Sequence, residues 1–123
     1  MRTLLMTLAF ATAFSAMAQK GGNNTRSPEE KAQQRTERMV KELGLTGDQH
    51  AQVSKINLSF AKAMRDVATI EDEGARKGRA DALKESRDSS LGQVLTPDQY
   101  NKMLALREAH KAKQEADKNS SDE

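Results

Sequence analysis

Two pentapeptides with the pattern Leu-Thr-x-Asp-Gln carry the most specific hydrogen-bonding chemistry in this sequence. They occupy residues 45–49 and 95–99. A threonine at the N-cap of a helix accepts a hydrogen bond from a backbone N–H of the first turn. A glutamine three residues later can accept one from the N-cap amide, which closes a capping box. The predicted pairs are Thr46 with Gln49 and Thr96 with Gln99.

A leucine precedes each predicted cap, where it can pack on the first helical turn as a hydrophobic staple. In the second motif Tyr100 stands at the right offset to receive that leucine. Pro97 takes the first helical position, where its missing N–H costs nothing. The first motif has a glycine there instead, so we expect a weaker helix start. We predict an architectural role, fixing helix starts and turns, for Leu45, Thr46, Gln49, Leu95, Thr96 and Gln99.

Little else in the chain could support catalysis, which needs convergent groups with tuned pKa values. There is no cysteine, which excludes a thiol nucleophile, a disulfide and a thiolate metal site. His50 and His110 belong to no metal-ligand motif, and solvated surface histidine is the favoured interpretation. A metal site shared by the two histidines across a hairpin or dimer stays open. We therefore predict that the protein is not an enzyme and uses no cofactor.

The N-terminus has the layout of a secretory signal peptide over residues 1–18. Arg2 is followed by an apolar run over residues 4–14 and then by a small-x-small site that ends at Ala18. The run is too short to span a bilayer. We expect cleavage after Ala18, a periplasmic protein without stable membrane insertion, and a flexible linker over residues 19–26.

Composition predicts an all-α protein with a small core. Charged residues make up 31% of the chain, and 20 basic residues against 18 acidic ones give no general attraction to nucleic acid. Beyond the leader the aromatic residues are Phe60 and Tyr100, which is too few for a thick globule. We expect a thin, extended helical hairpin assembly whose core is completed by antiparallel homodimerisation.

About four helices are predicted over residues 27–116, followed by a disordered tail at 117–123. Ser27 and Thr46 are N-caps of the first two helices, and Gly44 is placed to end the first helix in a left-handed C-cap. Two glycines predict a turn or hinge over Gly74–Gly78, although ion pairs could carry the helix through it. The third helix is expected at roughly 79–93 and the fourth from Pro97.

An apolar seam runs along the second predicted helix at spacings of three and four residues, the heptad pattern of a helix that packs on another helix. The basic residues that follow are Arg76, Lys77, Arg79, Lys84 and Arg87. For them we favour a solvated face over one that steers acidic or unfolded chains. Met64 is either core filler or a promiscuous apolar contact. The candidate client-binding or dimer surface comprises Val53, Ile56, Phe60, Met64, Val67, Ile70, Arg76, Lys77 and Arg79.

With its two Leu-Thr-x-x-Gln motifs on capped helices, the chain resembles the Spy/CpxP family of periplasmic proteins from about Ser27 to Lys113. The resemblance implies four helices per chain and a thin antiparallel homodimer shaped like a cradle. It also implies an inner surface that mixes apolar and basic side chains. The implied activity is ATP-independent chaperoning of unfolded periplasmic proteins, or modulation of an envelope-stress or metal-stress sensor.

The leading hypothesis is an exported chaperone-like protein that binds unfolded or partly folded envelope proteins. The alternative is a regulatory accessory protein that binds the periplasmic sensor domain of a stress-response or metal-response kinase. A third interpretation is a helical envelope protein whose partner is another structural protein. A chaperone should be indifferent to the sequence of its client, whereas a regulator should not.

Overall fold

The computed structural model describes residues 26–121, and this part of the chain is all α. It contains α1 (Pro28–Leu43), α2 (Gly47–Val67), α3 (Glu73–Val94) and α4 (Pro97–Ser121). The prediction of an all-α assembly of about four helices is confirmed. The predicted signal peptide and residues 19–25 of the predicted linker lie outside the described residues.

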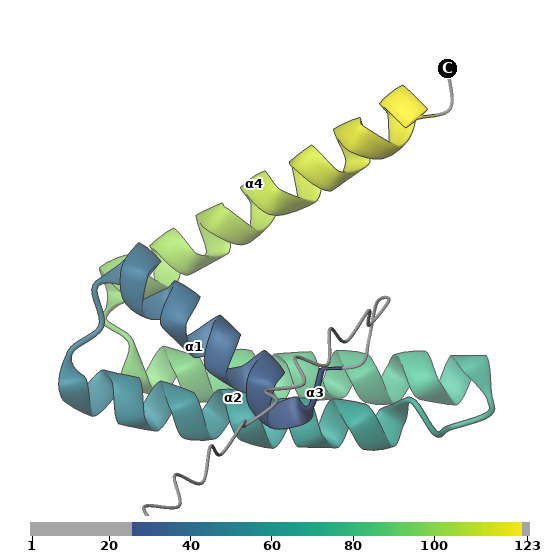
Figure 1. The fold of residues 1–123 in the computed structure, drawn as a ribbon, viewed down its shortest axis with the longest axis horizontal. Helices are drawn as coiled ribbons and strands as arrows, with labels where there is room; N and C mark the ends of the chain where they lie inside the picture. The colour runs from purple at the N-terminus through teal and green to yellow at the C-terminus, as the bar shows by residue number, and fades with distance from the viewer. Residues whose placement is uncertain (1–25, 122–123) are drawn as a thin grey trace, which may run out of the picture.

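The helices form an open V rather than a closed bundle (Figure 1). α2 and α3 make an antiparallel hairpin, which is one arm. α1 lies obliquely across this hairpin, and α4 leaves the junction as the second arm, with its C-terminal end far from the hairpin. The backbone of α4 comes close to those of α1 and α3. None of the helices described is both long and apolar enough to cross a membrane.

The hydrophobic core sits at the vertex of the V, where the ends of all four helices meet. Its buried members are Met39, Leu43, Val53, Leu91, Leu95 and Met103. Half-buried Leu45, Ile56, Val94, Tyr100 and Leu106 pack around them. Val53 is 0% exposed and Leu91 is 1% exposed. Because large apolar side chains gather here, the vertex carries most of the burial that stabilises the fold.

Both ends of α1 follow the predicted caps. The Ser27 hydroxyl accepts a hydrogen bond from the Glu30 N–H at 3.2 Å. At the other end Gly44 has a φ of 65°, and its N–H donates to the Val40 carbonyl at 3.0 Å. Glycine suits this left-handed position because a β-carbon would strain it. The chain therefore turns sharply into the first Leu-Thr-x-Asp-Gln motif.

The hairpin turn lies before the two glycines, which corrects the prediction of a turn over Gly74–Gly78. α2 ends at Val67, and α3 starts at Glu73, so both glycines are helical. The Asp72 carboxylate explains the early start, because it accepts the Ala75 N–H at 2.7 Å as an N-cap. The Asp72 cap therefore sets the start of α3, although the two glycines that follow have low helix propensity.

The end of the apolar seam also needs correction. Ile70 lies in the turn between α2 and α3 and so does not continue the helical face. Its N–H donates to the Val67 carbonyl at 3.0 Å, and its own carbonyl accepts from the Arg76 guanidinium at 3.1 Å. The heptad spacing therefore persists in the sequence beyond the point where the helix ends.

The predicted disordered tail at 117–123 is helical as far as Ser121, and residues 122–123 lie outside the described part. Residues 108–121 of α4 are exposed throughout. Alanine, lysine and glutamate have high helix propensity, which favours the helix without packing. Near its end the Ser120 and Ser121 hydroxyls donate to the Asp117 carbonyl at 3.1 and 2.9 Å.

Candidate functional site

The two sequence motifs meet at the vertex through their glutamines. Gln49 Nε2 donates to Gln99 Oε1 at 2.7 Å, and Gln99 Nε2 donates to Gln49 Oε1 at 3.1 Å. One glutamine lies in the first turn of α2 and the other in the first turn of α4. The pair, which we call the glutamine clasp, therefore joins the starts of two helices that are fifty residues apart in sequence.

Each glutamine also closes a capping box on its own helix. The Thr46 N–H donates to Gln49 Oε1 at 3.0 Å, and the Gln49 N–H donates to Thr46 Oγ1 at 3.3 Å. The corresponding bonds between Thr96 and Gln99 are 3.0 and 3.2 Å. Both boxes satisfy amides that have no partner inside the helix.

The remaining amide hydrogens of the clasp reach the ends of the other two helices. Gln49 Nε2 donates to the Val94 carbonyl at 3.2 Å, and Gln99 Nε2 donates to the Leu43 carbonyl at 3.3 Å. These carbonyls belong to the last residues of α3 and α1, where intrahelical donors run out. Each glutamine thus uses two donors and two acceptors, and together they tie all four helices in a nearly two-fold symmetric arrangement.

The sequence predicted the boxes but not their meeting. A capping box needs only an acceptor at its third helical position, which glutamate supplies equally well. Glutamine in both copies adds an NH₂ group with two further donors. That repeated choice of amide over carboxylate was the signal that each side chain also serves acceptors outside its own helix.

The leucines of the motifs pack as staples on the core. Leu95 is buried, and Leu45 is half-buried against the same cluster. Tyr100 packs there too, and its ring lies so close to α3 that a β-carbon at Gly92 would meet it at 3.6 Å. All six motif residues therefore lie at the vertex, with the four hydrogen-bonding ones in or beside the clasp.

A second constellation lies on the α1, α2 and α3 surfaces beyond the clasp. The Arg87 guanidinium is 4.4 Å from the centre of the Phe60 ring, and the Arg35 guanidinium is 5.5 Å from it. Both distances fall within the range of cation–π attraction. Arg87 is 8% exposed, whereas Phe60 is half-buried. The ring therefore lies close to two cations while part of it stays accessible.

One carboxylate serves this cluster. Asp88 accepts two hydrogen bonds of 2.8 Å from Arg107 of α4 and one of 3.2 Å from Arg87 Nε. We call Arg35, Phe60, Arg87, Asp88 and Arg107 the arginine–phenylalanine cluster. Burial together with the charges of Arg87 and Arg107 lowers the pKa of Arg35 to about 10, so Arg35 stays protonated at neutral pH. Three cations face one anion, and the cluster carries excess positive charge.

The ion pair between Asp88 and Arg107 predicts a loss of stability in acid. Burial alone would raise the pKa of Asp88, but the hydrogen bonds and charge of Arg107, with those of Arg87, outweigh it and lower the pKa. A carboxyl whose pKa is lower in the folded state stabilises above its unfolded pKa of about 3.9, and this contribution disappears as the pH falls through the folded value. Wild type should exceed Asp88→Asn in unfolding free energy by roughly 1 kcal/mol at pH 7.

Urea unfolding of both proteins between pH 7 and pH 2 measures this difference. The two unfolding free energies should converge as the pH falls below about 4, because wild type then also carries a neutral side chain at position 88. A difference that stays constant across the whole range would show that packing rather than the charge of Asp88 is responsible.

The predicted apolar seam divides between the core and the surface. Val53 and Val67 are buried within the single chain, at 0% and 4% exposure. Ile56, Phe60 and Met64 stay half-buried. Val53 packs with core residues of α1 and α3, so the chain itself covers part of the face that was expected to need a partner.

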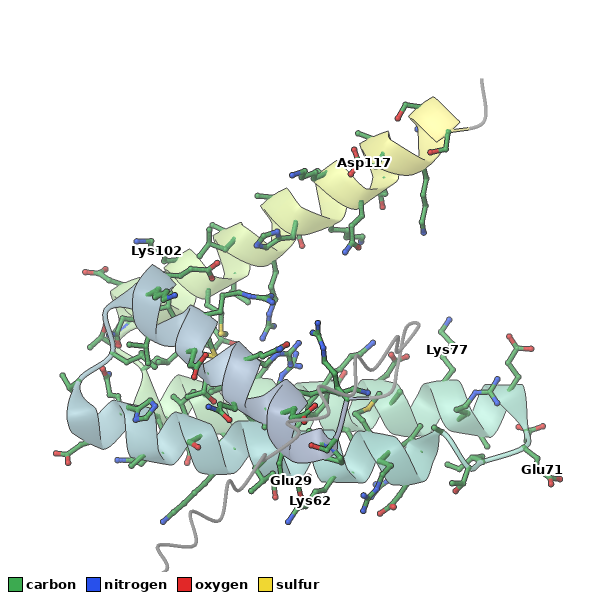
Figure 2. The ribbon with its side chains drawn as sticks, in the orientation of Figure 1. Glu29, Lys62, Glu71, Lys77, Lys102 and Asp117 are labelled. Atoms are coloured by element: carbon green, nitrogen blue, oxygen red, sulfur yellow. The ribbon has the colours of Figure 1, made fainter. Side chains whose placement is uncertain are left out.

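Of the predicted basic residues, Arg87 belongs to the arginine–phenylalanine cluster, whereas Arg76, Lys77 and Arg79 lie apart from it. Arg76 is half-buried and held by the Ile70 carbonyl, while Lys77 and Arg79 are exposed on the first turns of α3. Figure 2 shows Lys77 on the hairpin arm, well away from the vertex. Ten residues of helix separate Lys77 from Arg87, which is about 15 Å. Arg35 of α1 and Arg107 of α4 join Arg87 in the cluster because the helices cross here, which residue spacing does not reveal.

A buried polar pair was not foreseen either. Asn57 of α2 is 1% exposed, and its Nδ2 donates to Thr36 Oγ1 of α1 at 3.0 Å. The Thr36 hydroxyl in turn donates to the Ala32 carbonyl at 2.8 Å. Asn57 Oδ1 has no hydrogen-bond partner within residues 26–121. The sequence signal for this pair was Asn57 itself, a polar residue on an otherwise apolar helical face.

The comparisons with known proteins place the chain in a family. A family model described as a domain of unknown function, DUF4890, matches residues 15–122. The chain belongs to this family. No curated protein and no solved structure matches it. All four helices of the DUF4890 chain lie inside the matched segment.

The histidines of this DUF4890 chain lie on different elements. His50 is exposed in the first turn of α2, and His110 is exposed on α4, beside a hollow lined also by Arg38 and Arg107. Across the described helices and turns, no three histidine, cysteine, aspartate or glutamate residues are placed to hold a metal ion.

Proposed function

We propose that this DUF4890 chain is an exported, ATP-independent chaperone-like protein that binds unfolded or partly folded envelope proteins. The observation that supports this most is the half-buried Phe60 ring framed by Arg35 and Arg87. A surface that pairs an accessible apolar group with excess positive charge suits transient contact with many sequences. The resemblance to the Spy/CpxP family and the leader-like residues 1–18 favour the same role in the periplasm.

The proposed mechanism separates capture from holding. The uncompensated positive charge of the arginine–phenylalanine cluster attracts acidic stretches of a client and raises the encounter rate. Phe60, with the half-buried Ile56 beside it, then offers a small apolar contact. Because the contact area is small, each client should dissociate quickly, which lets it fold between encounters.

We also propose that the working form is a homodimer. The apolar content of one chain is small, Leu104 of α4 is exposed, and the arm formed by α4 has no partner along residues 108–121 within the described structure. A second copy could cover these faces. Sedimentation at micromolar concentrations should show a dimer, and a stable monomer throughout that range would contradict this part of the proposal.

Aggregation of chemically unrelated clients tests the function directly. Purified residues 19–123 should suppress light scattering by several thermally or chemically unfolded proteins in the absence of ATP. Suppression of none would contradict the proposal. Tight binding to the periplasmic domain of one sensor kinase, without suppression of any client, would instead support the regulatory alternative.

Charge reversal on the α2–α3 hairpin tests whether its exposed cations also attract clients. Lys77→Glu together with Arg79→Glu changes two exposed side chains, so the melting temperature should stay nearly unchanged. The rate of client association should fall several-fold at low salt, and the difference from wild type should shrink at high salt. Stopped-flow mixing with a fluorescent unfolded client measures both. An unchanged rate at low salt would confine capture to the arginine–phenylalanine cluster.

A further inference from the structure

A half-open groove of about 720 Å³ runs between α1 and α2, and it shares only Phe60 and Arg35 with the proposed client contact. Its apolar floor comes largely from α2, through Phe60, Ala61, Met64 and Ala68. α1 crosses the hairpin obliquely, which leaves this space beside it (Figure 1). A volume of this size is within the range of small-molecule sites.

The rim of the groove is strongly cationic. Arg26, Lys31, Arg35 and Arg38 come from the α1 side, and Arg65 comes from α2. No carboxylate lines the groove in the described part of the chain. Arg26 donates to the neutral Gln34 at 2.6 Å, which leaves its charge uncompensated. Such a rim selects an anionic group, and guanidinium groups suit phosphate especially well.

The floor offers almost no hydrogen bonds. Asn57 borders the groove, but its side chain is 1% exposed and already donates to Thr36 Oγ1. An extended peptide would bring an N–H and a C=O with every residue, and these groups would lose solvent against alanine, methionine and phenylalanine without gaining partners. A hydrocarbon chain has no polar groups and needs no hydrogen-bond partners.

From the cationic rim and the apolar floor, we infer that the groove binds a single-chain anionic phospholipid. The phosphate lies among the rim cations, and the acyl chain lies along Ala61 and Met64. This site is separate from the proposed client contact except for Phe60 and Arg35, which border both.

The binding test uses a fluorescent lysophosphatidylglycerol below its critical micelle concentration and the purified mature chain. We expect saturable binding of one lipid per chain. Lysophosphatidylcholine, whose head group has no net charge, should bind at least about tenfold more weakly. Inorganic phosphate at the same concentration should not displace the probe. Equal binding of both lipids would overturn the role of the cationic rim.

Two variants locate the site without relying on buried residues. Lys31→Ala together with Arg65→Ala removes one exposed cation from each rim and should weaken binding by about tenfold or more. Lys111→Ala together with Lys113→Ala removes two exposed cations from α4, outside the groove, and should leave binding unchanged. Equal losses in the two variants would show non-specific attraction and overturn the assignment.

A steric variant tests the floor independently of charge. Ala61→Phe places a ring in the groove and should abolish saturable binding while circular dichroism shows an unchanged helical content. If this variant binds the lipid normally, the acyl chain of the lipid lies elsewhere and the inference is wrong. Displacement of the lipid by a peptide of alternating leucine and glutamate, at comparable concentration, would show that the groove binds peptides instead.

Failure of the lipid-binding proposal can be told apart from failure of the chaperone proposal. The Lys31→Ala and Arg65→Ala changes leave the Phe60, Arg87 and Arg107 contacts in place, so client suppression should persist where lipid binding is lost. Failure of the wild-type chain to suppress aggregation, with lipid binding intact, would contradict the chaperone proposal and leave the lipid site standing.

Discussion

Replacing either clasp glutamine by alanine is expected to lower the free energy of unfolding by about 2–4 kcal/mol. Gln49 takes part in hydrogen bonds with Thr46, Val94 and Gln99 through its side chain, so its loss leaves several partly buried partners unpaired. One hydrogen bond contributes about 0.5–1.5 kcal/mol, and a buried group without a partner costs about 1–3 kcal/mol. Urea unfolding followed by circular dichroism measures the change. Gln52→Ala, at an exposed site on α2, is the matched control and should stay within about 0.5 kcal/mol of wild type.

Glutamate at the same positions separates the clasp from the capping box. Gln49→Glu keeps the acceptor for the Thr46 N–H and for Gln99 Nε2 but removes both donors, so it should retain the cap and lose its hydrogen bonds to the Val94 carbonyl and to Gln99 Oε1. We expect most of the alanine effect to remain in this variant. The double variant Gln49→Ala with Gln99→Ala should cost less than the sum of the single ones, with a coupling of about 1–2 kcal/mol. Fully additive losses would mean that the glutamines act as two independent caps.

Leu91→Ala and Phe60→Ala are expected to have opposite consequences for stability and binding. Leu91 is 1% exposed at the centre of the vertex core, so its truncation should cost about 2–5 kcal/mol. Phe60 is half-buried between Arg35 and Arg87, so its truncation should cost less than half as much. Well below its melting temperature, Leu91→Ala should still suppress client aggregation, whereas Phe60→Ala should not.

Thermal unfolding and the aggregation assay, run on the same protein preparations, check this pair. Leu83→Ala, at a half-buried position beside Phe60 on the same hollow, serves as a control for the loss of apolar area alone. If Phe60→Ala destabilises as much as Leu91→Ala and retains client suppression, the ring is a core residue and the proposed contact is elsewhere.

Features set by three or four neighbouring residues could be predicted from the sequence. The N-caps at Ser27, Thr46 and Thr96 and the left-handed Gly44 depend only on their own turns, and all four occur as expected. The hairpin turn was misplaced for the same local reason. Two glycines suggested a break at positions where the Asp72 cap, a stronger local signal, had already started α3.

Features that depend on how helices cross could not be predicted. Arg35, Arg87 and Arg107 come from three helices and gather around Phe60 and Asp88 only because α1 and α4 converge at the vertex. Helical periodicity placed Phe60 on an apolar face but could not indicate which cations would approach it. Gln49 and Gln99 are an intermediate case between local features and helix crossings. Their side-chain NH₂ groups indicated further hydrogen-bond partners but not which ones.

Site-specific photo-crosslinking to an unfolded client tests the proposed contact most directly. A benzophenone amino acid in place of Phe60 puts the reactive group on the arginine-framed surface. The same residue in place of Lys102 puts it on α4, on the outer side of the V, where Figure 2 shows that lysine. Strong crosslinks from position 60 and few from position 102, with several unrelated clients, are the predicted result. Equal crosslinking at the two positions, or crosslinking at position 102 alone, would contradict client binding at the arginine–phenylalanine cluster.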